Sequence, residues 1–541
     1  MKSGLRFSGL IAAATLAATV ITGADAPGAL ADVAGTQASP LDEVVPLPAV
    51  VEPDADVTFR LTPATAIFAR FGSDETVRAA TLLAEDLRPA TGFPLPVVRV
   101  PDLGTPPGIS LRLVPDDGRI GQEGYRLDVT RTAVTIAAAS AAGLTNGVHT
   151  LRQLLPPEIE SETRRDGPWL LPGGRIIDHP RYAYRGAMLD LARYYFPPDV
   201  VKRHIDKVSM YKINYLHLHL TDDQGWRVEI DSWPRLATYG GSTQTGGGPG
   251  GYYTKDEYRD IVSYAQRRNV TIVPEIDVPG HTNAALASYA ELNCDGIAPP
   301  LYTGWDVGFS SLCLGRPVTE QFVDDVIREV AAMTPGEYLH IGGDEATAGT
   351  PEADYVAFMD MAAGIVAKYG KKVIGWHESL KGTPPSTSVG QYWYPWPDDE
   401  TAAGAAARGA RLIMSPANRA YLDMKYTPTV PEFGQVWAGF VEAENAYAWD
   451  PDTTVNGVAP ASVLGVEATM FTQIAPDEKS VDFMVFPRLP EIAEVAWTPR
   501  EALNWESIRA RLPEQGQRWD LWGINYYRSP QIPWAAQLPV G

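Results

Sequence analysis

The chain has 541 residues, of which 45% are hydrophobic and 21% are charged. These values exclude wholesale disorder and allow two or three domains with buried cores. The 45 lysines and arginines against 66 aspartates and glutamates give a formal net charge of −21. This acidic balance argues against binding to nucleic acid or to an anionic membrane, because both need a basic face. It suits a soluble protein that acts on a neutral or cationic ligand.

The N-terminus has the layout of a secretory signal. Lys2 and Arg6 precede an apolar run over residues 10–22, and residues 29–31 offer a small-residue cleavage site. The run is too short and too rich in alanine to span a membrane, which leaves a lipid-facing anchor as the alternative. We therefore expect residues 1–31 to be a signal peptide and the mature protein to be secreted, with no membrane attachment.

The two cysteines, Cys294 and Cys313, follow this signal and lie in one loop-like region. Export favours a disulfide between them. Neither cysteine has a histidine near it and no C-x-x-C pair is present, which argues against a thiol nucleophile or a thiolate metal site.

The segment from about residue 40 to 180 has the pattern of a small α+β domain. Short alternating strands are predicted over residues 109–114, 125–129 and 134–137, and helices over residues 76–87 and 143–155. Few residues of catalytic types cluster here, so we expect a structural companion domain.

After residue 180 the pattern changes to strand, loop and helix, repeated toward the end of the chain. The eight apolar strand candidates are residues 187–191, 215–220, 270–276, 338–341, 373–376, 388–393, 411–414 and 465–471. Eight such runs with helices between several of them predict a (β/α)8 barrel, and residues 505–522 are expected to form a closing helix. The predicted fold class is α/β, with a TIM barrel over residues 181–541.

Polar residues follow nearly every predicted barrel strand. They occupy residues 221–227, 275–281, 340–345, 376–378, 392–393 and 421–423. Because the carboxyl ends of barrel strands meet at one mouth, these side chains should gather there. Carboxylates transfer protons and orient hydroxyls, while indole rings stack on the C–H faces of sugars. The sequence therefore predicts a sugar site.

These motifs resemble glycoside hydrolase family 20, the β-N-acetylhexosaminidases. The most specific piece is His340-Ile341-Gly342-Gly343-Asp344-Glu345, and residues 184–190, 217–227 and 275–281 also match, so that the resemblance covers most of the mature chain. It implies an exo-acting enzyme that releases terminal non-reducing N-acetylglucosamine or N-acetylgalactosamine from chitooligosaccharides or glycoconjugates. It implies no cofactor and no metal, and the family also carries a cysteine pair near Cys294 and Cys313.

The resemblance also assigns catalytic roles. In this family the substrate's own 2-acetamido oxygen attacks the anomeric carbon. By resemblance, Glu345 is the general acid and then the base, Asp344 holds the acetamide N–H, and Tyr421 donates to the acetamide oxygen. Asp222 and His281 are expected to tune the proton on the acid.

Substrate-binding roles follow in the same way. Arg185 matches an arginine that holds the O3 and O4 hydroxyls, because a guanidinium offers a rigid two-donor fork. Trp376 and Trp393 match walls of the acetamide pocket. Asp423 matches a carboxylate near O6, and Trp437 matches a tryptophan on the aglycone side.

The chain departs from the family pattern after the eighth strand. The usual tryptophan is Phe471, and the usual glutamate two residues later is Gln473. Glutamine still forms hydrogen bonds, but charge-assisted bonds are roughly twice as strong. One expectation is weakened but ordinary hexosaminidase activity. The other is a preference for a sugar that is substituted or anionic at C4 or C6, although Asp423 argues against an anion at C6.

Two further functions stay open. A metal-dependent hydrolase is suggested by His217-x-His219, which puts two imidazoles on one face of a strand, but the chain has no H-E-x-x-H motif. A non-catalytic sugar-binding protein on the same fold would be expected to lose the acid, whereas Asp344, Glu345 and Tyr421 are all present.

Overall fold

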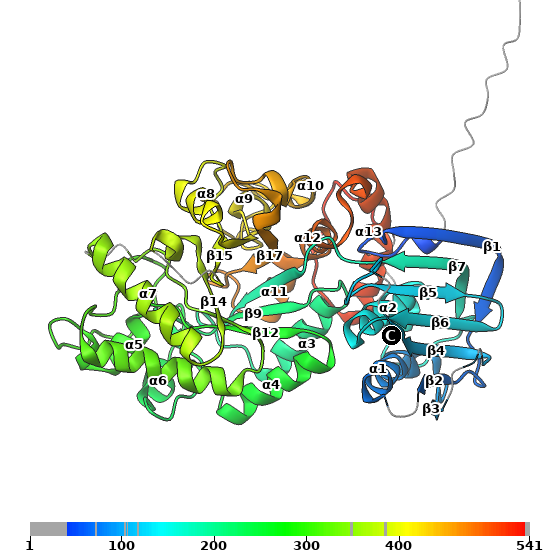
Figure 1. Ribbon diagram of the computed structural model, residues 1–541, viewed down its shortest axis with the longest axis horizontal. Coiled ribbons are helices and arrows are strands. Elements are labelled where there is room, and N and C mark those ends of the chain that lie inside the picture. The colour runs from blue at the N-terminus through cyan, green and yellow to red at the C-terminus, as the bar shows by residue number, and fades with distance from the viewer. Residues whose placement is uncertain are drawn as a thin grey trace, which may run out of the picture. The chain divides into compact units, whose positions relative to one another are not determined.

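The computed structural model describes residues 40–70, 73–101, 104, 106–115, 118–346, 350–382 and 387–535. The predicted signal peptide lies outside the described residues. Within them, no helix combines the length and the apolar character needed to cross a bilayer. The described residues form one compact unit, which contains an open sheet with two helices and a closed barrel (Figure 1).

The N-terminal part is built on a seven-stranded sheet in the order β1-β7-β5-β6-β4-β2-β3. Its strands are β1 (Val50–Arg60), β2 (Ile67–Arg70), β3 (Val97–Val100), β4 (Gly108–Leu113), β5 (Tyr125–Val129), β6 (Ala133–Ala138) and β7 (Leu170–Asp178). Helices α1 (Asp74–Thr91) and α2 (Ala141–Gln153) pack on this sheet around one apolar core. The three predicted strands and two predicted helices are present. Strands β1, β2, β3 and β7 were not predicted.

The C-terminal part is a closed barrel of eight parallel strands, in the order β12-β13-β14-β15-β16-β17-β8-β9. The strands are β8 (Tyr184–Asp190), β9 (Tyr215–His219), β12 (Thr271–Glu275), β13 (Tyr338–His340), β14 (Lys372–Trp376), β15 (Val389–Tyr392), β16 (Arg411–Met414) and β17 (Val463–Met470). Each coincides with one of the eight strands expected from the sequence, so the barrel prediction is confirmed. The short strands β10 (Thr221–Asp222) and β11 (Gly225–Trp226) form a hairpin after β9.

Helices connect the barrel strands and close the chain. They are α3 (Pro198–Ser209), α4 (Lys255–Arg267), α5 (Asn283–Ser288), α6 (Pro317–Met333), α7 (Glu352–Lys368), α8 (Glu400–Ala407), α9 (Ala417–Ala420), α10 (Ala443–Tyr447), α11 (Glu478–Val485), α12 (Arg488–Trp497) and α13 (Trp505–Trp522). The expected closing helix is α13. Single helical turns lie at Pro40–Asp42, Pro157–Glu160, Leu236–Gly240, Ala290–Leu292, His377–Lys381, Pro451–Thr453, Pro460–Ser462 and Arg500–Ala502.

Local capping signals place several of these helices. The hydroxyl of Ser140 accepts hydrogen bonds at the start of α2, and Asn504 caps α13 in the same way. Thr254 and Glu257 form a reciprocal capping box at the start of α4. These contacts satisfy backbone N–H groups that have no partner inside the helix, so these three helices begin where the sequence supplies an acceptor.

The barrel interior is layered, because side chains two residues apart on a strand share a face. An apolar layer fills the end near the strand starts and consists of Tyr184, Val273, Tyr338, Ile374, Val389, Ile413 and Leu464. A buried polar layer lies closer to the carboxyl ends of the strands and consists of His217, Glu275, His340, Gln391 and Glu467. Parallel pairing aligns Glu275 with both His219 and His340, so these groups meet across neighbouring strands.

The small domain contacts the barrel where the barrel strands begin. Lys212, which precedes β9, places its Nζ 2.8 Å from Asp178 Oδ2 at the end of β7. Trp497 Nε1 donates to the other oxygen of Asp178 at 2.9 Å. These groups are buried, so the two parts of the chain share a polar interface at the amino ends of the barrel strands.

Candidate active site

A cavity of about 500 Å³ lies at the carboxyl ends of the barrel strands, within the size range of small-molecule sites. Most of the residues predicted to act in a sugar site line it, namely Asp222, His281, Asp344, Glu345, Trp393, Tyr421, Asp423, Trp437, Phe471 and Gln473. They follow strands β9, β12, β13, β15, β16 and β17. The tertiary structure therefore brings together residues that are up to about 250 positions apart in sequence.

Two glycines shape the loop that carries the adjacent acids. Gly342 and Gly343 have φ angles of +63° and +98°, which glycine adopts at no steric cost. A Cβ on Gly342 would fall 1.7 Å from Asp277 Oδ1, and Gly343 N–H donates to the same oxygen at 3.2 Å. Glu345 and His281 also have left-handed φ angles, of +48° and +53°. Such strain in non-glycine residues concentrates at functional sites.

One imidazole links the acid pair to a third carboxylate. His281 Nε2 lies 3.4 Å from Glu345 Oε2 and 3.5 Å from Asp344 Oδ2, while Nδ1 lies 3.4 Å from Asp222 Oδ1. Burial lowers the pKa of His281, but the carboxylates of Asp222 and Asp344 outweigh it and hold the pKa well above its usual range. His281 is therefore a buried cation between carboxylates.

The pKa values of the neighbouring Asp222 and Asp277 are shifted in opposite directions. Burial raises the pKa of Asp222, but Arg193 and His281 outweigh it and hold the pKa well below its usual range. Arg193 Nη2 lies 2.7 Å from Asp222 Oδ2. Burial and the charge of Asp344 instead hold the pKa of Asp277 well above normal. Asp222 is therefore held as an anion, whereas the environment of Asp277 favours its protonated form.

Aromatic rings form one wall of the cavity. The Tyr421 ring centroid lies 5.6 Å from that of Phe471 and 5.8 Å from that of Trp437, and Trp437 lies 5.6 Å from Trp393. Trp393 Nε1 donates to the Glu378 carboxylate at 3.1 Å. Burial raises the pKa of Tyr421 well above its usual range, so its phenol stays protonated and available as a donor.

The prediction that Arg185 binds substrate hydroxyls is wrong. Arg185 is the second residue of β8, and its two Nη atoms donate to Glu123 of the small domain at 2.9 and 2.8 Å. Its Nε donates to the Lys212 carbonyl. The arginine that lines the cavity is Arg193, which follows the end of β8. Its place after a barrel strand is the sequence signal that identifies it.

Trp376, which the resemblance predicts as a wall of the acetamide pocket, lies deep beside the cavity. The side chain is 1% exposed and is not among the cavity-lining residues. Its Nε1 donates to Glu275 Oε1 at 3.1 Å, and its ring centroid lies 6.1 Å from that of Phe471. Trp376 therefore supports a cavity wall from behind.

Sequence reasoning missed two tryptophans among the cavity-lining residues. Trp305 is 61% exposed and Trp396 is 66% exposed. Trp305 lies in the loop closed by the Cys294–Cys313 disulfide, and the presence of this bond confirms the predicted pairing. Neither tryptophan follows a strand directly, so the barrel pattern supplied no signal for them.

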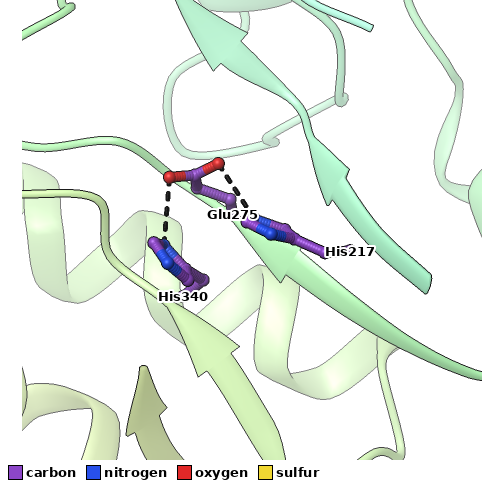
Figure 2. A group of neighbouring side chains, drawn as sticks. All are labelled: His217, Glu275 and His340. Carbon is purple, nitrogen blue, oxygen red and sulfur yellow. Dashed lines mark hydrogen bonds and ion pairs between the residues drawn. The ribbon is translucent and has the colours of Figure 1, made fainter. Parts of the chain in front are cut away.

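Figure 2 shows a buried group that has metal-ligand residue types. His217 Nε2 lies 2.9 Å from Glu275 Oε2, and His340 Nδ1 lies 3.0 Å from Glu275 Oε1. Their candidate ligand atoms all lie within 4.8 Å of one another. His217 hydrogen-bonds Glu275, and His340 Nδ1 accepts the Gly342 N–H at 3.0 Å, so the geometry of this cluster is explained by contacts within the protein.

Comparisons with known proteins identify the family of the chain. The model described as "Glycosyl hydrolase family 20, catalytic domain" matches residues 182–500, and "Glycosyl hydrolase family 20, domain 2" matches residues 42–179. The chain is 43% identical to the β-N-acetylhexosaminidase of Cellulomonas fimi over 494 residues, which cover 91% of this chain and 97% of the relative.

Solved structures give the same result. The GH20 β-N-acetylhexosaminidase of Streptomyces coelicolor A3(2) superimposes with a TM-score of 0.88 at 54% identity, over 92% of this chain and 99% of that chain. A mutant Streptomyces plicatus β-hexosaminidase in complex with the product GlcNAc has the same TM-score, identity and coverage. Both domains are thus accounted for by one family. The chain belongs to glycoside hydrolase family 20.

Proposed function

We propose that the protein is an exo-acting β-N-acetylhexosaminidase that releases terminal non-reducing N-acetylglucosamine or N-acetylgalactosamine with retention of configuration. The observation that carries this proposal is the adjacent pair Asp344–Glu345, held against the single imidazole of His281 in a cavity walled by aromatic rings. Family 20 is an exception among retaining glycosidases because the substrate supplies the nucleophile.

The geometry accommodates both steps of that mechanism. The acetamido oxygen attacks C1 while Glu345, whose side chain is 34% exposed, gives its proton to the leaving oxygen. Asp344 accepts the acetamide N–H and stabilises the cyclic oxazolinium-type intermediate, and Tyr421 donates to the acetamide oxygen. Water then attacks C1 and opens the intermediate, while the Glu345 carboxylate takes a proton from this water. The proton transfer restores the acid.

The decisive experiment compares two aryl β-glycosides, one with a 2-acetamido group and one with a 2-hydroxyl group. We expect cleavage of the acetamido sugar only, with inhibition by a thiazoline analogue of the intermediate. The 2-hydroxyl sugar lacks the nucleophile, so equal cleavage of both would contradict substrate assistance. Cleavage of neither by the native protein would favour a sugar-binding role.

We further propose that Phe471 and Gln473 weaken the binding of the ordinary sugar without replacing it by another substrate. Gln473 lines the cavity, and its buried Oε1 has no hydrogen-bond partner among the described residues. The same holds for Asp423 Oδ1, so both atoms are available to sugar hydroxyls. A neutral amide accepts a hydroxyl more weakly than a carboxylate does.

The variants Gln473→Glu and Phe471→Trp test this proposal. A charge-assisted hydrogen bond adds about 1 kcal/mol over a neutral one, so Gln473→Glu should raise kcat/KM for an N-acetylglucosaminide about fivefold. Glycosides substituted at C4 or C6 should gain less. If the native protein cleaves the substituted glycosides faster than the ordinary one, the alternative specificity is correct.

The substrates we propose are chitooligosaccharides or glycoconjugates, met outside the cell after removal of residues 1–31. The signal-like layout of residues 1–31 and the disulfide support an exported protein. Mass spectrometry of the culture-medium protein tests this, because the expected N-terminus is Asp32. A full-length chain retained in the cell would contradict it.

A further inference from the structure

Alternating carboxylates and imidazoles form a continuous chain from the barrel interior to the active site. In order, its members are Glu467, His217, Glu275, His219, Asp222 and His281, and all are at most 4% exposed. His217 bridges Glu467 Oε1 and Glu275 Oε2, at 2.9 Å from each. His219 contacts the same Glu275 oxygen through Nδ1 and lies 2.7 Å from Asp222 Oδ2 through Nε2. We refer to these six residues as the relay.

The protons within the relay follow from its geometry. A carboxylate only accepts hydrogen bonds, so an imidazole that faces a carboxylate on each side must carry a hydrogen on both nitrogens. His217 and His219 are therefore cations. Burial lowers the pKa of His217, but Glu467 and Glu275 outweigh it and raise the pKa to about 9. Burial likewise opposes protonation of His219, and Glu275 with Asp222 holds its pKa well above normal.

Neutral donors hold the inner end of the relay. Tyr184 Oη donates to Glu467 Oε2 at 2.6 Å, and Gln391 Nε2 donates to Glu467 Oε1 at 2.8 Å. Gly186 leaves the space for this carboxylate, because a Cβ there would fall 2.5 Å from Glu467 Oε2. Trp376 Nε1 donates to Glu275 Oε1. The inner carboxylates are thus fixed by rigid strands, and the outer end of the relay is the part that faces the reacting groups.

We propose that Glu275 and His219 are positioning residues for proton transfer at Glu345. Glu275 orients His219, His219 and Arg193 hold Asp222 from one side, and Asp222 orients His281 toward Asp344 and Glu345. This inference rests on the proposed function and extends it, because it assigns a role in the acid–base cycle to groups buried in the barrel interior. Neither Glu275 nor His219 exchanges a proton with the substrate.

The pH dependence of kcat/KM distinguishes a positioning role from a purely structural one, because it responds to charge near the general acid. The charged and titratable groups around Asp222, His281 and Glu345 are Asp190, Arg193, His219, Asp223, Glu275, Asp277, Asp344, Glu378, Tyr394 and Tyr421. His219→Gln removes a cation from this set, and Glu275→Gln removes an anion. Both replacements retain hydrogen-bonding capacity at nearly the original size.

The first experiment measures kcat/KM against pH for the two variants. The basic limb of the kcat/KM profile reports loss of the proton from the general acid. Loss of the His219 cation makes the site more negative, so this limb should move to higher pH. Loss of the Glu275 anion should move the limb to lower pH, each by about half a unit or more. Shifts of the same sign, or a fall in kcat with the limb unmoved, would overturn the proposal.

The second experiment varies the leaving group. A good aryl leaving group needs little protonation, whereas a poor one depends on a well-placed acid. In the Glu275→Gln variant, hydrolysis of a glycoside with a poor leaving group should slow at least tenfold more than hydrolysis of a glycoside with an activated leaving group. An equal loss on both substrates would show that the variant disturbs the fold or the acetamide pocket, and would contradict the positioning role.

Glu491 in α12 supplies a matched control. It is as buried as Glu275, lies outside the relay, and its carboxylate has no hydrogen-bond partner among the described residues. Burial holds its pKa well above normal, which favours the uncharged form. Glu491→Gln therefore makes the same residue replacement in the protein interior without removing a charge from the relay, and we expect the pH profile and the leaving-group dependence of the native protein.

A spectroscopic measurement separates this inference from the proposed function. The chain has eight histidines, so ¹⁵N spectra of the imidazoles can be assigned by single replacements. In the native protein at pH 7, His217 and His219 should each carry two protonated nitrogens. If the acetamido glycoside is not cleaved, the proposed function fails while these spectra still report on the relay. A neutral His219 in the native protein would overturn the inference whatever the activity.

Discussion

Arg185 and Arg193 serve opposite ends of one barrel strand. Arg185 lies at the start of β8 and pairs with Glu123 of the small domain, whereas Arg193 lies beyond its end and pairs with Asp222. A strand rises about 3.3 Å per residue, so the seven residues of β8 separate the two roles by roughly 20 Å. Residue type alone does not distinguish them, but position relative to the strand does.

Replacing each arginine by lysine separates binding from stability. Lysine keeps the charge and loses the planar fork. Arg193→Lys should lower kcat/KM at least tenfold, because Asp222 loses a fixed partner at the site. Arg185→Lys should lower the free energy of unfolding by about 1–3 kcal/mol through unsatisfied buried acceptors, with KM unchanged. Enzyme kinetics and urea unfolding measure the two effects, and the reverse pattern would restore Arg185 as the substrate arginine.

Asp423 makes the stability of the protein depend on pH. Burial raises the pKa of this cavity carboxyl to about 7, against roughly 4 in an unfolded chain. The folded protein therefore keeps a proton that the unfolded chain releases between these values. The resulting stability is fully present below about pH 4 and is lost as the pH rises through 7.

Asp423→Asn removes this dependence. A difference of about 3 pKa units corresponds to roughly 4 kcal/mol. We expect the unfolding free energy of the variant, relative to the native protein, to rise by about this amount between pH 4 and pH 8. Urea unfolding at several pH values measures it, and parallel curves for the two proteins would show that Asp423 is not buried as a neutral acid.

At the scale of elements, the turn after β13 depends on glycine. Gly342→Ala would place a methyl group against Asp277 and force alanine into a left-handed conformation. Left-handed backbone costs roughly 1–2 kcal/mol and overpacking 1–3 kcal/mol, so the unfolding free energy should fall by about 2–5 kcal/mol and activity should be lost.

Replacing Gly364 in α7 by alanine is expected to have the opposite effect on the free energy of unfolding. It is exposed, and no atom lies within 4 Å of a Cβ added there. Gly364→Ala should stabilise the protein by about 0.5–1 kcal/mol, because alanine has the higher helix propensity. Thermal unfolding of both variants tests the contrast, and similar effects at the two sites would remove the steric argument for Gly342.

The elements that the sequence predicted are those with regular hydrophobic periodicity. Each barrel strand is buried and therefore consists of a short run of mostly apolar residues, which can be recognised in the sequence. Strand β1 was missed because it is mostly exposed, contains Pro53, and shifts register between Pro53 and Thr58. Its pairing with β7 depends on a partner about 120 residues away, which no local pattern reports.

At the scale of the whole molecule, the small domain is coupled to the barrel far from the chemistry. All the cavity-lining residues belong to the barrel, whereas the buried pair Lys212–Asp178 joins the two parts at the amino ends of the strands. Tyr125 and Trp497 donate to the same carboxylate. The small domain therefore supports the barrel without contributing to the cavity lining.

Lys212→Met tests this separation of roles. Removing one partner of a buried ion pair costs about 3–5 kcal/mol, because the remaining charge stays buried. We expect the unfolding free energy to fall by this amount, with KM and the pH profile unchanged in the folded variant. A changed KM would show that the domain interface acts on the cavity.

The sequence by itself determined the eight barrel strands and the motif with adjacent acids, because these follow from local periodicity and local spacing. It also indicated the disulfide, because the chain has two cysteines and the layout of an exported protein. The tertiary structure alone decided that Arg193 and not Arg185 lines the cavity, and that Trp376 lies behind its wall. It alone placed Glu467, His217, Glu275 and His219 in one relay beneath Asp222. These arrangements depend on strand register and barrel closure, which bring side chains from distant strands into contact and which no single segment encodes.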